Sequence, residues 1–193
     1  MPKIAENFIN NPLLIVSMKV VILFLFLCAF ILGCATTKED INKTYEKGGE
    51  SMKLSSNAFQ NGSMIPSKYA CKGDNINPQL SWSDAPAGTK SFALIVDDPD
   101  APAGTWVHWL VKDILADTRE IKEDSIPGTE VENDFGKEGY GGPCPPSGVH
   151  RYFFKLYALN VASFDAYSKS DFYNKVDQLK ISESVLMGKY SKG

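Results

Sequence analysis

The stretch SFALIVDDPDAPAGTWVHWLVKDI, residues 91–114, decides the fold. It opens with a nearly continuous apolar run over residues 91–97, which is typical of a strand buried on both faces. A second such run follows over residues 106–114, after a loop rich in Asp, Pro and Gly. If these two strands pair as neighbours, the loop between them brings Asp98 and His108 to the same end of the sheet.

Further strand signals lie on both sides of this stretch. A short alternating strand is indicated over residues 79–82, and the longest apolar strand over residues 150–159. The domain opens with strand signals at residues 52–54 and 58–59, before the turn pair Asn61-Gly62. Most of the chain is therefore expected to be β-structure.

Helical signals occur only near the carboxyl terminus. Phe172, Val176 and Leu179 stand at helical spacing and predict a helix over residues 170–179. A further helical turn is indicated over residues 182–188, with Gly188 as its end. Strands first and helix last predict a mainly β fold, an antiparallel two-sheet β-sandwich with a peripheral C-terminal helix.

Length and charge restrict the class of protein. The chain has 193 residues, which suits one domain with an additional segment. It carries 20 Lys and Arg against 23 Asp and Glu, with a pI near 5.4. Because there is no basic excess, nucleic acid is not expected as a partner.

The additional segment is amino-terminal. The uncharged apolar run over residues 20–32 is shorter than the roughly 20 residues that a membrane-spanning helix needs. It fits the apolar part of a secretory signal, and its end, Leu32-Gly33-Cys34, resembles the lipobox of bacterial lipoproteins. An uncleaved signal anchor and a generic secretory peptide are the alternatives.

The predicted organisation follows from this segment. Residues 1–33 are a signal region, with Met18 as an alternative start, and residues 34–51 are a lipidated Cys34 followed by a flexible tether. Residues 52–193 are the folded domain. The mature lipoprotein would be anchored in the membrane of the bacterial cell envelope, with the outer membrane favoured because Ala35 is no inner-membrane retention signal.

Two cysteines remain in the domain, Cys71 and Cys144. An exported protein can oxidise them to a disulfide, but the sequence leaves open whether the two residues meet. The chain has no Cys-x-x-Cys pair, so neither a zinc knuckle nor a thioredoxin-type site is supported.

Two loops hold most of the residues that could carry chemistry. Asp98 and Asp100 lie in the first, and His108 follows it on the strand face that Trp106 and Leu110 share by alternation. The second, residues 139–149, combines glycines that allow close backbone approach with prolines that fix its shape. His150 and Tyr152 come next, on one strand face.

The two histidines, the tyrosine and this rigid loop could line one small polar pocket for a phosphate or carboxylate. Asp98 is expected to face this pocket, whereas Asp100 is expected to be structural.

Several other interpretations of these residues are weaker. A lone strand histidine is usually a core residue, and two histidines with a carboxylate could also form a facial metal triad. Ser147 lies near His150, but no Gly-x-Ser-x-Gly elbow and no oxyanion hole accompany it. We therefore expect a non-catalytic binding protein without a cofactor, while the spacing alone leaves the metal triad open.

Three segments in order resemble the signature regions of the phosphatidylethanolamine-binding protein family, also called Raf kinase inhibitor-like proteins. They are DPDAP at 98–102, WVHW at 106–109 and GPCPPSGVHRY at 142–152. YACKG at 69–73, NPQLSW at 77–82 and GKY at 188–190 look like its bacterial branch. The resemblance covers about residues 52–192. The chain departs from eukaryotic members in its short 98–108 loop and in Val107, where they often carry a second histidine.

The resemblance implies a two-sheet β-fold with a shallow, metal-free anion pocket. It implies binding of phosphate, acetate or a phospholipid head group such as phosphorylethanolamine. An alternative function is a protein-interaction module that inhibits a protease or kinase. The positions that the resemblance assigns to the ligand site are Asp98, Asp100, Trp106, His108, Gly142, Pro145, Pro146, His150 and Tyr152.

Overall fold

A computed structural model describes residues 51–192 of the chain. The predicted signal region, lipidated Cys34 and all but the last residue of the tether lie outside the described residues, as does Gly193. Within the described part, no helix is long and apolar enough to cross a membrane.

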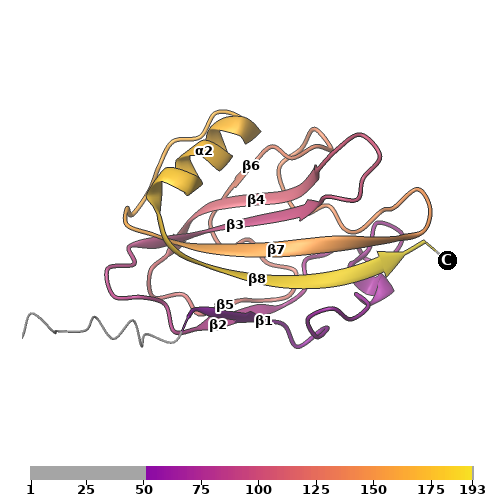
Figure 1. Ribbon diagram of the computed structural model, residues 1–193, viewed down its shortest axis with the longest axis horizontal. Coiled ribbons are helices and arrows are strands. Elements are labelled where there is room, and N and C mark those ends of the chain that lie inside the picture. The colour runs from indigo at the N-terminus through magenta and orange to yellow at the C-terminus, as the bar shows by residue number, and fades with distance from the viewer. Residues whose placement is uncertain (1–50, 193) are drawn as a thin grey trace, which may run out of the picture. The chain divides into compact units, whose positions relative to one another are not determined.

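The described residues form two antiparallel sheets and one α-helix (Figure 1). This confirms the predicted two-sheet β fold. The three-stranded sheet has the order β1-β2-β5, with β1 Lys53–Ser55, β2 Leu80–Ser83 and β5 Glu120–Ile121. The five-stranded sheet has the order β6-β4-β3-β7-β8, with β6 Thr129–Val131, β4 Trp106–Leu115, β3 Ser91–Asp98, β7 Val149–Leu159 and β8 Lys180–Ser191.

Strand β3 is the middle strand of the larger sheet, and all of its residues are buried. Burial on both faces explains its continuous apolar sequence, as predicted. One face packs against the three-stranded sheet, where Phe92 meets Trp82 with ring centroids 5.2 Å apart. The other face, through Ala93 and Ile95, packs against the helix. The sheet thus has a core on each side.

The α-helix α2, Lys169–Leu179, covers this second face. It begins where the Ser168 hydroxyl accepts a hydrogen bond from the backbone N–H of Asp171, which is a typical N-cap. Phe172 and Val176 are its buried residues, at the predicted spacing. The prediction of this helix is confirmed.

The further helical turn predicted over residues 182–188 is wrong, because these residues belong to β8. Pairing of β8 with β7 runs from Val149↔Ser191 to Leu159↔Lys180, and this long ladder outweighs a weak local helix signal. Gly188 is not a helix end. A Cβ at Gly188 would lie 2.4 Å from Cγ1 of Ile65, so glycine is needed there for close packing.

A β-bulge changes the predicted face of one residue. The register between β3 and β4 shifts after Val96, which pairs with Trp109, whereas Asp97 pairs with Val107. The extra residue is His108, and the strict alternation is therefore interrupted. Leu110 packs with Val107 on the helix-covered face, so the prediction that it shares a face with His108 is wrong.

The two domain cysteines form a disulfide. The Cα atoms of Cys71 and Cys144 lie 5.4 Å apart, within the usual range for a bridge. The bond joins the segment after a short 3-10 helix (η1, Ser67–Tyr69) to the Gly/Pro loop before β7. The backbone N–H of Cys71 also donates to the carbonyl of Pro143, which fixes the same two segments.

Candidate functional site

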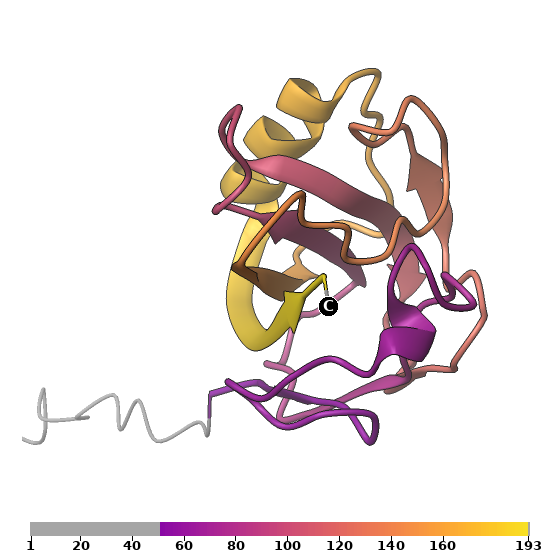
Figure 2. The ribbon, with the colours of Figure 1, turned by 90° about the vertical axis from the view of Figure 1, so that its right-hand side faces the viewer.

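The predicted site residues gather at one end of the five-stranded sheet, which Figure 2 shows facing the viewer. Asp98 ends β3 and pairs with Trp106, the first residue of β4. The neighbouring strand β7 begins at the same end, so His150 lies beside Asp98. The prediction that the 98–105 loop brings Asp98 and His108 to the same end of the sheet is confirmed.

His150 and Asp98 form a buried pair. The Nδ1 atom of His150 donates to Oδ2 of Asp98 at 2.7 Å, and only 8% of His150 and 3% of Asp98 is exposed. The other oxygen of Asp98 accepts the backbone N–H of Asp100 at 2.8 Å. Asp98 therefore orients the imidazole and leaves its Nε2 atom for another partner.

His108 is fixed in the same manner by the Gly/Pro loop. Its Nδ1 atom lies 2.6 Å from the carbonyl oxygen of Gly141, and because a carbonyl only accepts, Nδ1 carries the proton. The backbone N–H of Gly141 donates in return to the His108 carbonyl at 3.0 Å. Burial lowers the pKa of His108, which favours the neutral ring in the ligand-free protein.

Tyr152 packs against His108 and lies on the same face of β7 as His150, so the three side chains form one cluster. Its ring meets that of His108 edge-on, with centroids 5.2 Å apart. Its hydroxyl is buried and makes no hydrogen bond of normal geometry to another described residue, although the Asp98 carboxylate lies close to it. Burial, and then the nearby Asp98 carboxylate, raise the pKa of Tyr152, so the phenol stays protonated and can donate.

The Gly/Pro loop, residues 139–149, is fixed by contacts with residues 69–75. The N–H of Gly142 donates to Oδ1 of Asn75 at 2.8 Å, and a Cβ at Gly142 would lie 2.2 Å from the carbonyl oxygen of Tyr69. Pro145 is buried, whereas Pro146 is exposed at the surface. Gly142 thus serves close packing of the loop, and Pro145 and Pro146 lie between the disulfide and β7.

Two aromatic rings border His108. Half-buried Trp106 meets Phe135 edge-on at 5.5 Å, and Phe135 meets His108 at 5.2 Å. Phe135 is 40% exposed. Sequence reasoning missed it, because it is a single apolar residue in the polar 132–138 segment and carries no strand or helix period.

Asp100 has a structural task. It accepts from the Arg151 guanidinium at 2.8 and 2.6 Å and from the Arg151 backbone N–H at 2.9 Å. Arg151 lowers the pKa of Asp100 to about 2. Both carboxylate oxygens are therefore occupied in fastening the 98–105 loop to β7, in line with the structural part expected for Asp100.

Tyr190 also lies beside the cluster, directly opposite His150 in the β7–β8 pair. Opposed residues of antiparallel strands point to the same face, so this ring shares the face of His150. The motif at 188–190 contained Tyr190, but the sequence could not align it with the site because the β7–β8 register was unknown. Within residues 51–192, no three His, Cys, Asp or Glu side chains are grouped to hold a metal.

A sequence model described as phosphatidylethanolamine-binding protein matches residues 55–191. The chain belongs to this family. It is 45% identical over 161 residues to a UPF0098 protein of Aquifex aeolicus, covering 78% of this chain and 94% of that protein.

Solved structures of two relatives share the fold. A phosphatidylethanolamine-binding protein homologue of Chlamydia trachomatis, CT736, has a TM-score of 0.71 and 40% identity. YbcL of Escherichia coli, described as a new member of the mammalian family, has a TM-score of 0.70 and 32% identity. Each comparison covers 74% of this chain and 99% of the other.

Proposed function

We propose that this family member binds a small phosphate- or carboxylate-type anion, free or as part of a phospholipid head group, and catalyses no reaction on it. The observation that carries the proposal is the pair of imidazoles. Each is held through Nδ1, by Gly141 or by Asp98, and neither Nε2 atom bonds to another described residue. Tyr152 adds a buried hydroxyl close to Asp98 that makes no hydrogen bond of normal geometry to another described residue.

The hydrogen-bond pattern specifies how an anion would be held. Because Nδ1 of each ring carries a proton, Nε2 of the neutral ring is an acceptor. It can accept from the P–OH group of a protonated phosphate, or it can take up a proton and then donate to an anion. The Tyr152 hydroxyl can donate in either case. The proposed site would therefore bind an anion together with one proton, which either the ligand brings or an imidazole takes up.

A binding function suits this cluster better than hydrolysis. Among the described residues, neither histidine hydrogen-bonds to a serine, threonine or cysteine side chain. Ser147 is exposed in the Gly/Pro loop, with no hydrogen bond to His150. An activated nucleophile needs a base within hydrogen-bond reach, which this arrangement does not offer.

We also propose that the domain is held at the bacterial cell envelope by lipid on Cys34. Support comes from the apolar run over residues 20–32 and from the Leu32-Gly33-Cys34 junction that ends it. A disulfide in the domain suits an oxidising compartment. Such an anchor would keep the proposed site close to phospholipid head groups.

Calorimetric titration of the purified chain tests the anion site. Inorganic phosphate and phosphorylethanolamine are each expected to bind saturably to the natural sequence. His108→Gln, whose amide can still donate to Gly141, should weaken both by about tenfold or more, the cost of one charged hydrogen bond.

Tyr152→Phe and Tyr157→Phe form a matched pair on β7. Tyr152 belongs to the cluster, whereas Tyr157 packs on the helix-covered side. Only Tyr152→Phe should reduce the affinity. Equal binding by the natural chain and His108→Gln would refute the assigned site. Preference for phosphorylethanolamine over phosphate would identify the head group as the ligand.

A further inference from the structure

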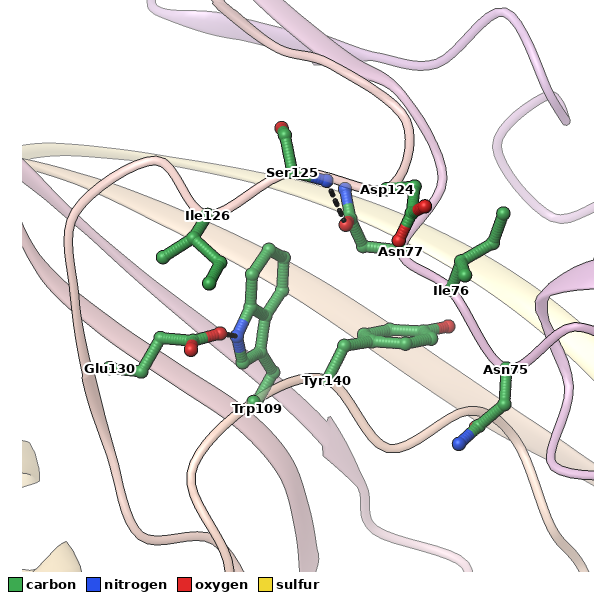
Figure 3. A pocket seen from close by; sticks show the side chains of 10 residues that line it. Asn75, Ile76, Asn77, Trp109, Asp124, Ser125, Ile126, Glu130 and Tyr140 are labelled. Carbon is green, nitrogen blue, oxygen red and sulfur yellow. Dashed lines mark hydrogen bonds between the residues drawn. The ribbon is translucent and has the colours of Figure 1, made fainter.

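A hollow borders Trp109 and Tyr140 (Figure 3). It has a volume of about 480 Å³, within the roughly 300–1,000 Å³ of typical ligand pockets. Neither histidine lines it, so it is separate from the proposed anion site. The lining residues that matter for its chemistry are Trp109, Tyr140, Glu130, Asp124 and Ile126.

Two aromatic rings form one wall of this hollow. The rings of Trp109 and Tyr140 meet edge-on with centroids 5.6 Å apart, and both point into the space in Figure 3. The Tyr140 hydroxyl donates to the Tyr69 carbonyl at 3.2 Å, which holds the ring in place. Aromatic faces attract cations that approach within about 6 Å of the ring centre.

The charged side chains that line the hollow are all acidic. Its lining includes the carboxylates of Glu130 and Asp124 and no lysine, arginine or histidine. Oε1 of Glu130 accepts from the indole Nε1 of Trp109 at 2.7 Å, and Oε2 makes no hydrogen bond to another described residue. One carboxylate oxygen therefore remains beside the indole ring for a charged donor.

The hollow is preformed rather than collapsed. Asn77, only 4% exposed, accepts from the Ser125 N–H at 2.9 Å and donates to the Lys122 carbonyl at 2.9 Å. These bonds fix the segment that carries Asp124, and Figure 3 shows Asp124 and Glu130 on different sides of the two rings. A fixed wall reduces the ordering cost of binding.

We infer that this hollow binds an organic cation, an alkylammonium or guanidinium group on a short aliphatic stem. The charged group pairs with Glu130 against the ring of Trp109, Asp124 adds negative charge from the other side of the rings, and the stem packs on exposed Ile126. A free amine and a lysine or arginine side chain of a peptide share this chemistry. The inference does not depend on anion binding by the histidine cluster.

The indole N–H signal of Trp109 reports the binding directly. The chain has only 3 tryptophans, so Trp109→Phe assigns this signal in a proton–nitrogen NMR spectrum. Titration of the purified chain with agmatine and n-butylammonium should shift it saturably at millimolar concentration, whereas 1-butanol should not. A lysine-containing tripeptide, blocked at both ends, tests the peptide source.

Charge-removing variants locate the site. Glu130→Gln keeps an acceptor for the Trp109 indole and should weaken agmatine about tenfold, the cost of one charged hydrogen bond at a partly buried residue. Glu132→Gln, which lies outside the hollow, should change the affinity less than about twofold. Asp124→Asn provides an independent test if Glu130→Gln fails to fold, with a loss of about threefold. His108→Gln should bind agmatine normally.

Three results would overturn the inference. One is a Trp109 signal that does not move with either cation. Another is an equal shift with 1-butanol, which would make the hollow merely apolar. The third is an equal loss of affinity in Glu130→Gln and Glu132→Gln, which would indicate long-range charge instead of a contact. Failure of phosphate binding alone would leave the inference standing.

Discussion

His108 and His150 each use Nδ1 to hold part of the protein, His108 on Gly141 and His150 on Asp98. This division of tasks gives each ring one structural nitrogen and one nitrogen for a ligand. Burial lowers the pKa of His108, and a bound anion would reverse this effect by compensating the imidazolium charge. The bound proton and the bound anion should therefore stabilise each other.

Anion affinity should consequently rise as the pH falls. Binding coupled to uptake of one proton strengthens by about tenfold per pH unit, so acetate should bind far more tightly at pH 5.5 than at pH 7.5. Calorimetry in two buffers of different ionisation enthalpy measures the proton directly. Affinity that is flat between these pH values would contradict the mechanism.

Without ligand, the stability should change in the opposite direction. Because the folded-state pKa of His108 is lowered, the unfolded chain binds the proton more readily, and folding stability is lost as the pH falls below about 6.5. Urea unfolding at pH 7.5 and 5.5 should show a smaller loss for His108→Gln than for the natural chain. An equal loss would assign the effect to other groups.

Among the loops and strands, the Cys71–Cys144 disulfide fixes the Gly/Pro loop, residues 139–149, next to the candidate site. The two residues are 73 positions apart, and closing a loop of this length typically stabilises a domain by about 2–4 kcal/mol. A reductant should lower the free energy of unfolding by this amount in the natural chain and leave the double variant Cys71→Ser, Cys144→Ser unchanged. Urea titration measures both, and a reductant effect in the double variant would contradict the assignment.

Some of the strands and the helix could be predicted from the sequence, and others could not. Strands β3, β4 and β7 and helix α2 each show their period over many residues, and all four were predicted. Strands β5 and β6 are too short to show any period. The residues of β8 were misassigned in part because their conformation depends on pairing with β7, which no local pattern reveals.

Some residues of the candidate site could likewise be predicted from the sequence, and others could not. Asp98, His108, His150 and Tyr152 could be placed together because each stands next to a loop at a strand end. Phe135 and Tyr190 could not, since their positions follow from loop packing and strand register. The bulge at His108 also escaped prediction, because an extra residue in one strand leaves no mark on the apolar pattern.

For the molecule as a whole, the proposed lipid anchor at Cys34 would determine its cellular location. In a bacterial host, Cys34→Ser should abolish incorporation of labelled palmitate and move the protein from the membrane fraction to the soluble fraction. Cys28→Ser, inside the apolar run, is the matched control and should change neither. Labelling that persists in Cys34→Ser would refute lipidation at this residue.

The fold of the whole domain also determines which NMR signals can detect binding at the candidate site. Strand pairing in the five-stranded sheet places His108 and His150 at the same end, and the chain has only 2 histidines. Every imidazole signal in a proton–carbon NMR spectrum therefore comes from the proposed anion site. The most direct measurement is a phosphate titration of the purified chain followed through these two signals. Our account predicts that both shift together with a single dissociation constant; signals that stay still, or that move with two unrelated constants, would contradict it.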